Sequence, residues 1–352
     1  MKVLIYPKSH NPYHELLYKP MRDGHTQDTF SYLPMTPLNV ALFPFVLAAK
    51  RLQGYSAFHL HWHTFYLDKK YGIPFAKQIS LVNTFVSLTA IKALGYKLVW
   101  TVHNTTPHEQ QTSNDAFITR YTAKLASKLI VHSTHTITEL KALKADTSKA
   151  VVIPHGNYEG VYPRTMNRDE ARKQLAIAPH DRAILFFGNI RPYKGVEDLI
   201  EAFNKLDEKN IRLIIAGKCL DAQLVKDIQD AVASNPDITF INGNVPDEDV
   251  AMYYDAADVT CMPYKAVTTS GTVLLAATFG KPIVTPNLGA IRDIPEAVGV
   301  LYDPSKKDAL LSALKTVLSS DTKRSAMAKA SAAFSKTLSW DKISTETHKL
   351  YR

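Results

Sequence analysis

Residues 182–200 read RAILFFGNIRPYKGVEDLI, and this stretch indicates the fold class. Arg182–Phe187 is a short apolar run typical of a buried strand, and Val196–Lys205 has the spacing of an amphipathic helix. Gly188 and Gly195 bracket the connection between them. A strand, a tight turn and a helix in this order form the unit from which parallel sheets are built.

The same alternation runs along the whole chain. Before this stretch it predicts strands at Val3–Tyr6, Ala57–His61, Lys97–Val102, Lys128–His132 and Ala150–Ile153; after it, at Arg212–Ala216, Ile238–Ile241, Val259–Met262, Pro282–Val284 and Val298–Tyr302. The predicted helices include Val40–Leu52, Ile79–Leu94, Asp115–Leu125, Ala222–Ser234, Asp247–Tyr254 and Gly271–Phe279. We therefore expect an α/β protein with two facing, doubly wound Rossmann-like domains, 1–160 and 161–339, and a cleft between them.

Composition narrows the class of protein. The chain has 352 residues, of which 45% are hydrophobic and 21% charged, as in ordinary globular proteins. Its two cysteines, Cys219 and Cys261, are too few for a disulfide framework, which favours a reducing compartment. No stretch approaches the ~20 apolar residues that span a bilayer. We expect a cytoplasmic protein.

The positive charge is concentrated in the first half. The net charge is +9, and residues 1–165 hold 18 Lys and Arg against 9 Asp and Glu. The excess can be a solvated surface, a nucleic-acid footprint or an attraction to an anionic membrane. No zinc-finger, RNP or KH signature occurs, so nucleic acid is not an expected partner. Thr36–Leu52, an apolar stretch ending in Lys50-Arg51, predicts either a buried helix or one that lies peripherally on the inner face of the cell membrane.

Two strand–loop–helix units carry the best-defined site. In the first, Arg191 and Lys194 follow Gly188 just before a helix, an arrangement that suits a diphosphate. In the second, hydroxyl residues surround a glycine at a helix start, at Thr268, Thr269, Ser270, Gly271 and Thr272. Taken separately, the first can be a charged loop and the second an ordinary N-cap. One phosphate clamp built from both loops explains both.

These two units resemble the donor domain of GT-B glycosyltransferases close to family 4. The resemblance rests on Gly188–Gly195 paired with Ser270–Pro282, and on Ser339-Trp340-Asp341 before a last helix, 340–352, that crosses back onto the first domain. In the first half, Asn11-Pro12-Tyr13, His59–Trp62 and Trp100–Glu109 resemble bacterial exopolysaccharide and capsule transferases, including β-mannosyltransferase-like members.

The resemblance implies a function. A hexose would pass from a nucleoside diphosphate sugar to a saccharide acceptor, which is lipid-linked in many of these enzymes. Neither a metal ion nor another cofactor would take part. The product would belong to a cell-surface polysaccharide.

One departure from the family pattern bears on mechanism. Family 4 enzymes usually carry two glutamates, and the corresponding positions here are Val267 and Leu275. Neither side chain can accept a hydrogen bond, so the donor must be held otherwise. The stereochemistry of transfer, retaining or inverting, stays open. A GT-B epimerase, a phosphorylase or a catalytically inactive binding subunit are the alternatives.

The remaining site residues follow from the resemblance. Lys218 would reach the donor, and His103 would contact the donor sugar. The first-domain motifs place Asn11, His14, His61 and His108 at the acceptor. An inverting enzyme needs a general base, for which His14, Glu15, His103, Glu109 and Asp115 are unranked candidates. His59, His61 and His63 alternate on one strand but have no carboxylate or cysteine beside them, so we expect no metal site there.

Overall fold

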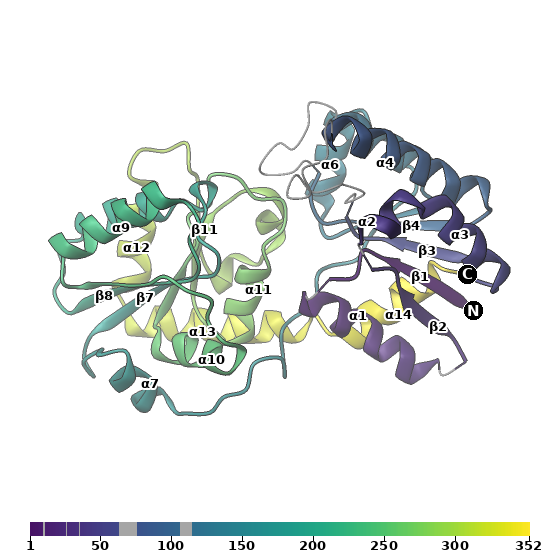
Figure 1. The fold of residues 1–352 in the computed structure, drawn as a ribbon. Coiled ribbons are helices and arrows are strands. Elements are labelled where there is room, and N and C mark those ends of the chain that lie inside the picture. The colour runs from purple at the N-terminus through teal and green to yellow at the C-terminus, as the bar shows by residue number, and fades with distance from the viewer. Residues whose placement is uncertain (10, 26, 35, 63–75, 106–114) are drawn as a thin grey trace. The chain divides into compact units, whose positions relative to one another are not determined.

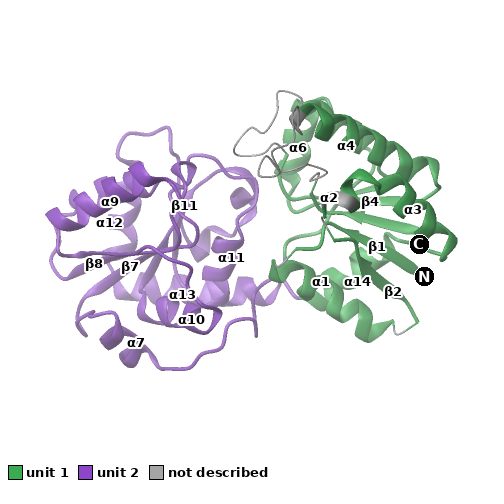
Figure 2. Ribbon diagram, viewed as in Figure 1, with its two compact units in different colours: residues 1–155, 340–352 green, residues 156–339 purple. Residues whose placement is uncertain are grey.

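The computed structural model describes residues 1–352 except 10, 26, 35, 63–75 and 106–114. The chain divides into two compact units (Figure 2). Unit 1 comprises Met1–His155 and Trp340–Arg352, and unit 2 comprises Gly156–Ser339. Each unit is built around one parallel sheet with helices on both faces (Figure 1).

The sheet of unit 1 has the strand order β2-β1-β3-β4-β5-β6. The strands are β1 (Lys2–Tyr6), β2 (Thr29–Tyr32), β3 (Ala57–Leu60), β4 (Lys97–Val102), β5 (Lys128–Val131) and β6 (Ala150–Val152). The helices are α1 (Pro12–Gly24), α2 (Pro37–Ala41), α3 (Phe43–Leu52), α4 (Ala76–Ala93), α5 (Asp115–Leu125), α6 (Thr134–Ala142) and α14 (Trp340–Lys349).

Alternate residues of β1 serve the two faces of this sheet, because successive strand side chains point to opposite sides. Leu4 and Tyr6 pack in the cluster that includes residues of α3–α6, whereas Val3 and Ile5 pack with α1 and α14. The C-terminal helix α14 lies along α1, and the Ser344 hydroxyl donates to the Leu17 carbonyl at 2.6 Å. The last segment of the chain therefore completes the core of unit 1.

The sheet of unit 2 has the order β12-β11-β10-β7-β8-β9. The strands are β7 (Arg182–Phe187), β8 (Ile211–Ala216), β9 (Ile238–Ile241), β10 (Val259–Cys261), β11 (Ile283–Pro286) and β12 (Gly299–Tyr302). The helices are α7 (Arg168–Gln174), α8 (Val196–Asn204), α9 (Ala222–Ser234), α10 (Asp247–Ala256), α11 (Gly271–Thr278), α12 (Ala309–Leu318) and α13 (Asp321–Lys336).

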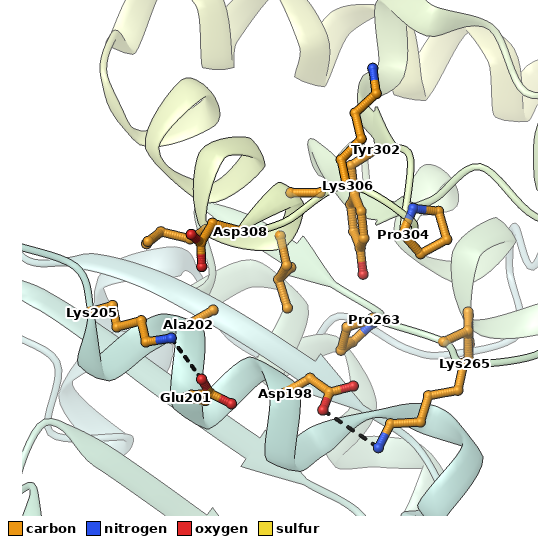
Figure 3. A pocket seen from close by; sticks show the side chains of 14 residues that line it. Asp198, Glu201, Ala202, Lys205, Pro263, Lys265, Tyr302, Pro304, Lys306 and Asp308 are labelled. Carbon is orange, nitrogen blue, oxygen red and sulfur yellow. Dashed lines mark hydrogen bonds and ion pairs between the residues drawn. The ribbon is translucent and has the colours of Figure 1, made fainter.

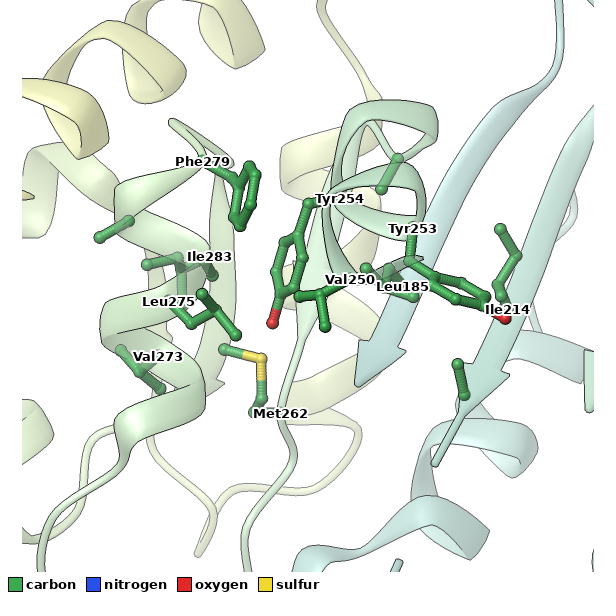
Figure 4. Packing of buried hydrophobic residues seen from close by; sticks show 14 of the residues in the cluster. Leu185, Ile214, Val250, Tyr253, Tyr254, Met262, Val273, Leu275, Phe279 and Ile283 are labelled. Carbon is green, nitrogen blue, oxygen red and sulfur yellow. The ribbon is translucent and has the colours of Figure 1, made fainter. Parts of the chain in front are cut away.

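The apolar run in β7 is continuous because both faces of this sheet are covered by helices. Ile184 and Phe186 pack against residues of α8, α9 and α12. Leu185 faces the other side, where residues of α10 and α11 meet (Figure 4). There the rings of Tyr254 and Phe279 stack at 4.8 Å.

The predicted fold class, an α/β protein with two parallel sheets of GT-B type, is confirmed. One predicted helix, Val40–Leu52, was wrong: the chain forms α2 and α3 with a break at Leu42. Pro44 accounts for the break, since it has no N–H to bond the Val40 carbonyl in a continuous helix and is tolerated in the first turn of a new one. Strand β2 was not predicted, because TFSY is short and lacks an apolar run. His61 and His132 follow their strands and are not part of them.

Candidate active site

The two predicted phosphate loops leave neighbouring strands of unit 2. The chain runs from β7 outward to β9, then returns to the other side of β7 with β10. The strand order thus reverses between β7 and β10, and ligands of doubly wound sheets bind at the carboxyl ends of the strands at such a switch point. Gly188–Gly195 follows β7, and Met262–Ser270 follows β10.

Contacts around Gly188 show that the two loops meet. This residue has a positive φ of 105°, and a Cβ placed on it would lie 3.4 Å from the Thr272 hydroxyl and 3.6 Å from Nζ of Lys194. Lys194 comes from the first loop and Thr272 from the start of α11. The ammonium, the hydroxyl and the half-buried Gly188 therefore lie close together.

Gly195 lies where the backbones of the two loops come into close contact. Its φ is 69°, in the left-handed region, and a Cβ there would lie 2.1 Å from the Pro263 carbonyl oxygen. The backbone can approach this closely only without a side chain. The Lys265 amide also donates to the Tyr193 carbonyl at 2.8 Å. The two loops are thus held against one another by their backbones.

Lys194 is a desolvated cation. Burial, and then the nearby charge of Arg191, lower its pKa to about 8 from an ordinary value of 10.5. None of the described residues offers its ammonium a hydrogen bond or an ion pair. A buried charge is unfavourable unless it is paired. An anion bound beside Gly188 would supply the missing partner.

The hydroxyls of the second loop have different surroundings. Ser270 caps α11, because its Oγ accepts from the Val273 amide at 3.2 Å and contacts the Tyr264 hydroxyl at 2.7 Å. The Thr269 hydroxyl is buried and has no partner within the described part of the chain. Thr268 is buried. Since first-turn amides lack partners inside a helix, those of Gly271 and Thr272 are available to a ligand.

The positions of the usual glutamates are part of the core. Leu275 is buried in the cluster around Tyr254 and Met262 (Figure 4). Val267 is partly buried against the same cluster. A carboxylate at Leu275 would be buried among apolar side chains. At these two positions the chain thus has apolar side chains that pack in or against the core, where the family pattern has hydrogen-bond acceptors.

A hollow of about 390 Å³ lies beside this site, between α8, the loop after β10 and the start of α12 (Figure 3). Two of its lysines are already paired, Lys205 with Glu201 at 2.6 Å and Lys265 with Asp198 at 3.4 Å. It includes none of the predicted donor-binding residues. Of the predicted donor-binding residues, Lys218 is exposed and Arg191 is half-buried.

A row of histidines lines the carboxyl edge of the sheet in unit 1. His61, His103, His132 and His155 come shortly after β3, β4, β5 and β6. Successive ring centroids are 5.3, 5.5 and 5.6 Å apart. Tyr13 contacts all four rings at 5.0 to 5.8 Å.

His14 completes this edge at the switch point of unit 1, between β1 and β3. Its ring lies 4.3 Å from that of His61 and 5.5 Å from that of Trp62. The residue is 2% exposed, and neither ring nitrogen has a hydrogen-bond partner among the described residues. Burial lowers its pKa to about 4. Buried polar groups are normally satisfied, so these nitrogens mark a place for a ligand.

Other predicted residues of unit 1 lie in different surroundings. Glu15 is exposed and pairs with Arg22 at 2.5 Å. Asn11 caps α1, since its side chain accepts from the Tyr13 amide at 3.0 Å. Asp115 is buried at the start of α5. His63, His108 and Glu109 lie outside the described residues.

The sequence reasoning missed Tyr13, His132 and His155. A signal was present, because His132 is the last residue of one predicted strand and His155 lies two positions after the end of the next. His132 donates from Nδ1 to the Ile153 carbonyl at 3.0 Å, which leaves a bare, buried Nε2 without a partner in the described ranges. It is a further acceptor of hydrogen bonds at this edge.

Comparisons with known proteins agree with this architecture. Residues 167–334 match the family described as glycosyl transferases group 1. The GDP-mannose:glycolipid 4-beta-D-mannosyltransferase of Xanthomonas campestris pv. campestris is 29% identical over 270 residues, 75% of this chain and 71% of that protein.

Solved structures share the fold across the whole chain. Sucrose-phosphate synthase from Thermosynechococcus elongatus superposes with a TM-score of 0.78 at 18% identity, covering 100% of this chain and 98% of that one. Anabaena HepE in complex with UDP gives 0.77 at 18% identity, covering 99% of each.

The two parallel sheets define a GT-B protein. The second unit contains the group 1 domain, and this match together with the relatives supports a GT-B glycosyltransferase of family 4 type. The resemblance read from the sequence is confirmed.

Proposed function

We propose that the protein transfers a hexose from a nucleoside diphosphate sugar to a lipid-linked saccharide, without a metal ion, in the synthesis of a cell-surface polysaccharide. The observation that carries this proposal is the ammonium of Lys194, which lies beside Gly188 and has no partner among the residues that the structure describes. As the glycosidic bond of the donor breaks, negative charge gathers on the diphosphate. Lys194, Arg191 and the amides at the start of α11 would stabilise that charge.

The hydroxyls around Ser270 support a donor site that does not depend on carboxylates. The Thr269 hydroxyl, which no described residue engages, would hold the sugar or ribose together with Thr268 and Thr272, in place of the two missing glutamates. Lys218 would reach the nucleotide from the loop after β8.

Unit 1 would bind the acceptor. Saccharides offer many hydroxyls, and His14, His61 and His132 lie at one edge of the sheet. The rings of His14 and His132 each have a nitrogen that bonds none of the described residues. Asn11 and His108 are proposed for the same site. His103, Glu15 and Asp115 are the proposed catalytic side chains.

A lipid-linked acceptor is supported by two observations. The Xanthomonas relative is named for GDP-mannose and a glycolipid. In addition, nine large apolar side chains are exposed among the described residues, and seven of them lie on α3–α5 or just before α3: Leu42, Phe45, Leu52, Ile79, Val82, Val86 and Phe117. None of the helices in the part of the chain that the structure describes is long and apolar enough to cross a membrane. We propose that this surface, the α3–α5 apolar surface, rests on the inner face of the membrane.

Thermal unfolding with a panel of GDP-, UDP- and dTDP-sugars tests the donor site. A ligand that binds only the folded state raises its stability by about 2.7 kcal/mol at 100 times its Kd. We expect one nucleotide class to raise the midpoint in the wild type but not in Lys194→Ala. No stabilisation by any nucleotide sugar, together with no transfer, would contradict the proposal.

A further inference from the structure

A chain of hydrogen bonds connects a buried tyrosine to His103. The Tyr18 hydroxyl, on α1, lies 2.8 Å from Nε2 of His61. Nδ1 of His61 lies 3.1 Å from Nε2 of His103. Tyr18 and His61 are fully buried, whereas His103 is half-buried at the edge of the sheet. The remaining nitrogen of His103, Nδ1, has no partner among the described residues and is the end of the chain.

The direction of donation along these hydrogen bonds decides whether His103 offers a ligand a hydrogen-bond donor or an acceptor. A neutral imidazole has one N–H and one bare nitrogen. If Tyr18 donates to His61, His61 donates to His103, and His103 keeps its proton on Nδ1 as a donor. In the opposite direction Nδ1 is bare, and His103 can act as a base.

Contacts at His59 determine the direction. The hydroxyl of Tyr18 lies 2.5 Å, and that of Tyr351 2.6 Å, from the same Nδ1 of His59. A bare ring nitrogen has one lone pair, whereas one N–H can be shared between two oxygens. The two short contacts therefore place the proton of His59 on Nδ1. Its bare Nε2 then accepts from the Thr101 hydroxyl at 2.8 Å.

Tyr18 must then donate its own proton elsewhere. Its other hydrogen-bond contact with a ring nitrogen is Nε2 of His61, at 2.8 Å. Tyr18 therefore donates to this nitrogen of His61.

We infer that Tyr18 is a positioning residue which, through His61, holds His103 in the tautomer that presents Nδ1–H, a hydrogen-bond donor, to the bound sugar. This inference rests on the proposed function and on the contact of His103 with the donor sugar that the family resemblance implies. It separates His103 from the candidate bases, since a nitrogen that carries a proton cannot remove one from the acceptor. An inverting transfer would then use a different base.

Nitrogen-15 NMR of the full chain, labelled in its histidine rings, tests the tautomer directly, because protonated and bare ring nitrogens resonate far apart. The signals of His103 are identified by their loss in His103→Asn. We expect a protonated Nδ1 and a bare Nε2 in the wild type. A bare Nδ1 would overturn the inference whatever any variant does.

Substitutions then test the role of the tyrosine. Tyr18→Phe keeps the ring but removes the donor, so the His103 signals should change to the opposite tautomer or to a mixture. Tyr96→Phe is the matched control, since its hydroxyl is also buried but donates to the Leu47 carbonyl, away from the chain. An unchanged His103 pattern in Tyr18→Phe would overturn the inference.

Transfer assays separate this inference from the proposed function. Loss of one oriented hydrogen bond to the sugar should lower kcat of Tyr18→Phe about tenfold. If the NMR pattern is as expected but Tyr18→Phe and His103→Asn both transfer at the wild-type rate, the presentation of Nδ1–H to the sugar is wrong. If no sugar is transferred by any form of the protein, the proposed function fails while the tautomer assignment stands.

Discussion

The proposed donor site depends most on two residues, Lys194 and Arg191. Charge-assisted hydrogen bonds to phosphate contribute about 1.5–3 kcal/mol. We expect Arg191→Ala and Lys194→Ala each to lower kcat/KM by at least about tenfold, which corresponds to ~1.4 kcal/mol of transition-state stabilisation. Lys265→Ala is the matched control, because its ammonium is exposed and pairs with Asp198. Wild-type transfer by both clamp variants would show that the diphosphate binds elsewhere.

His14, a residue of the proposed acceptor site, also affects how the stability of the folded protein depends on pH. Its pKa of about 4 in the folded protein lies below the ordinary 6.5, so the unfolded chain binds the proton more tightly. The stability due to the neutral ring is complete above pH 6.5 and is lost as the pH falls toward 4. That loss amounts to about 3 kcal/mol.

Replacing this ring should therefore stabilise the protein in acid. Between pH 7 and 4.5, we expect urea unfolding of His14→Phe to lose about 2 kcal/mol less than the wild type. His180→Phe, at an exposed position, should leave the pH dependence unchanged. An identical pH dependence for His14→Phe and the wild type would show that His14 is not the group that titrates. The variant should also use the acceptor more weakly.

At the scale of elements, α3–α5 carry the membrane prediction. Apolar side chains on these helices are exposed beside the basic end of α3, Lys50 and Arg51. Each basic residue near an anionic surface adds about 1 kcal/mol to binding, and salt screens this attraction. We expect the protein to co-sediment with phosphatidylglycerol vesicles, more strongly as the anionic fraction rises and less strongly as salt increases.

Variants define the surface in this experiment. Phe45→Glu with Val82→Glu should weaken vesicle binding, since both side chains are exposed, at 74% and 62%. Leu220→Glu is the control, with 64% exposure in unit 2. Equal recovery with neutral and anionic vesicles at low salt would contradict the prediction and leave the charge as a feature of solubility.

For the molecule as a whole we expect transfer to survive EDTA. In the proposed donor site, two cations and the amides of α11 would compensate the charge of the leaving diphosphate. The described residues do contain a cluster that could hold a metal ion, formed by His25, Asp28 and His348. It lies at the amino end of β2, whereas the histidine row lies at the carboxyl edge of the sheet.

The location of this cluster makes the chelator experiment sharper. If it does bind a metal ion, EDTA should change the stability of unit 1, where His348 of α14 bonds Asp28 at 2.7 Å, and not the rate of transfer. Loss of transfer in EDTA, restored by magnesium or manganese, would show that the donor site needs a metal ion.

Much of the fold could be predicted because strands and helices depend on local patterns. Lys97–Val102 and Arg182–Phe187 have the predicted bounds, since a buried strand needs a continuous apolar run. Strand β2 escaped prediction for the opposite reason: it lies at the sheet edge, and its half-exposed residues show no such run.

By itself, the sequence determined the class of fold and the two cations of the proposed donor site. Arg191 and Lys194 lie three residues apart in one loop, so their proximity is a local property of the chain. The histidine row is different. His61, His103, His132 and His155 are separated by 23 to 42 positions, and they meet only because β3, β4, β5 and β6 pair in parallel. Likewise, only packing decided that Leu275 belongs to the core and that Tyr18 reaches His61, since strand order and burial bring together side chains whose spacing carries no signal.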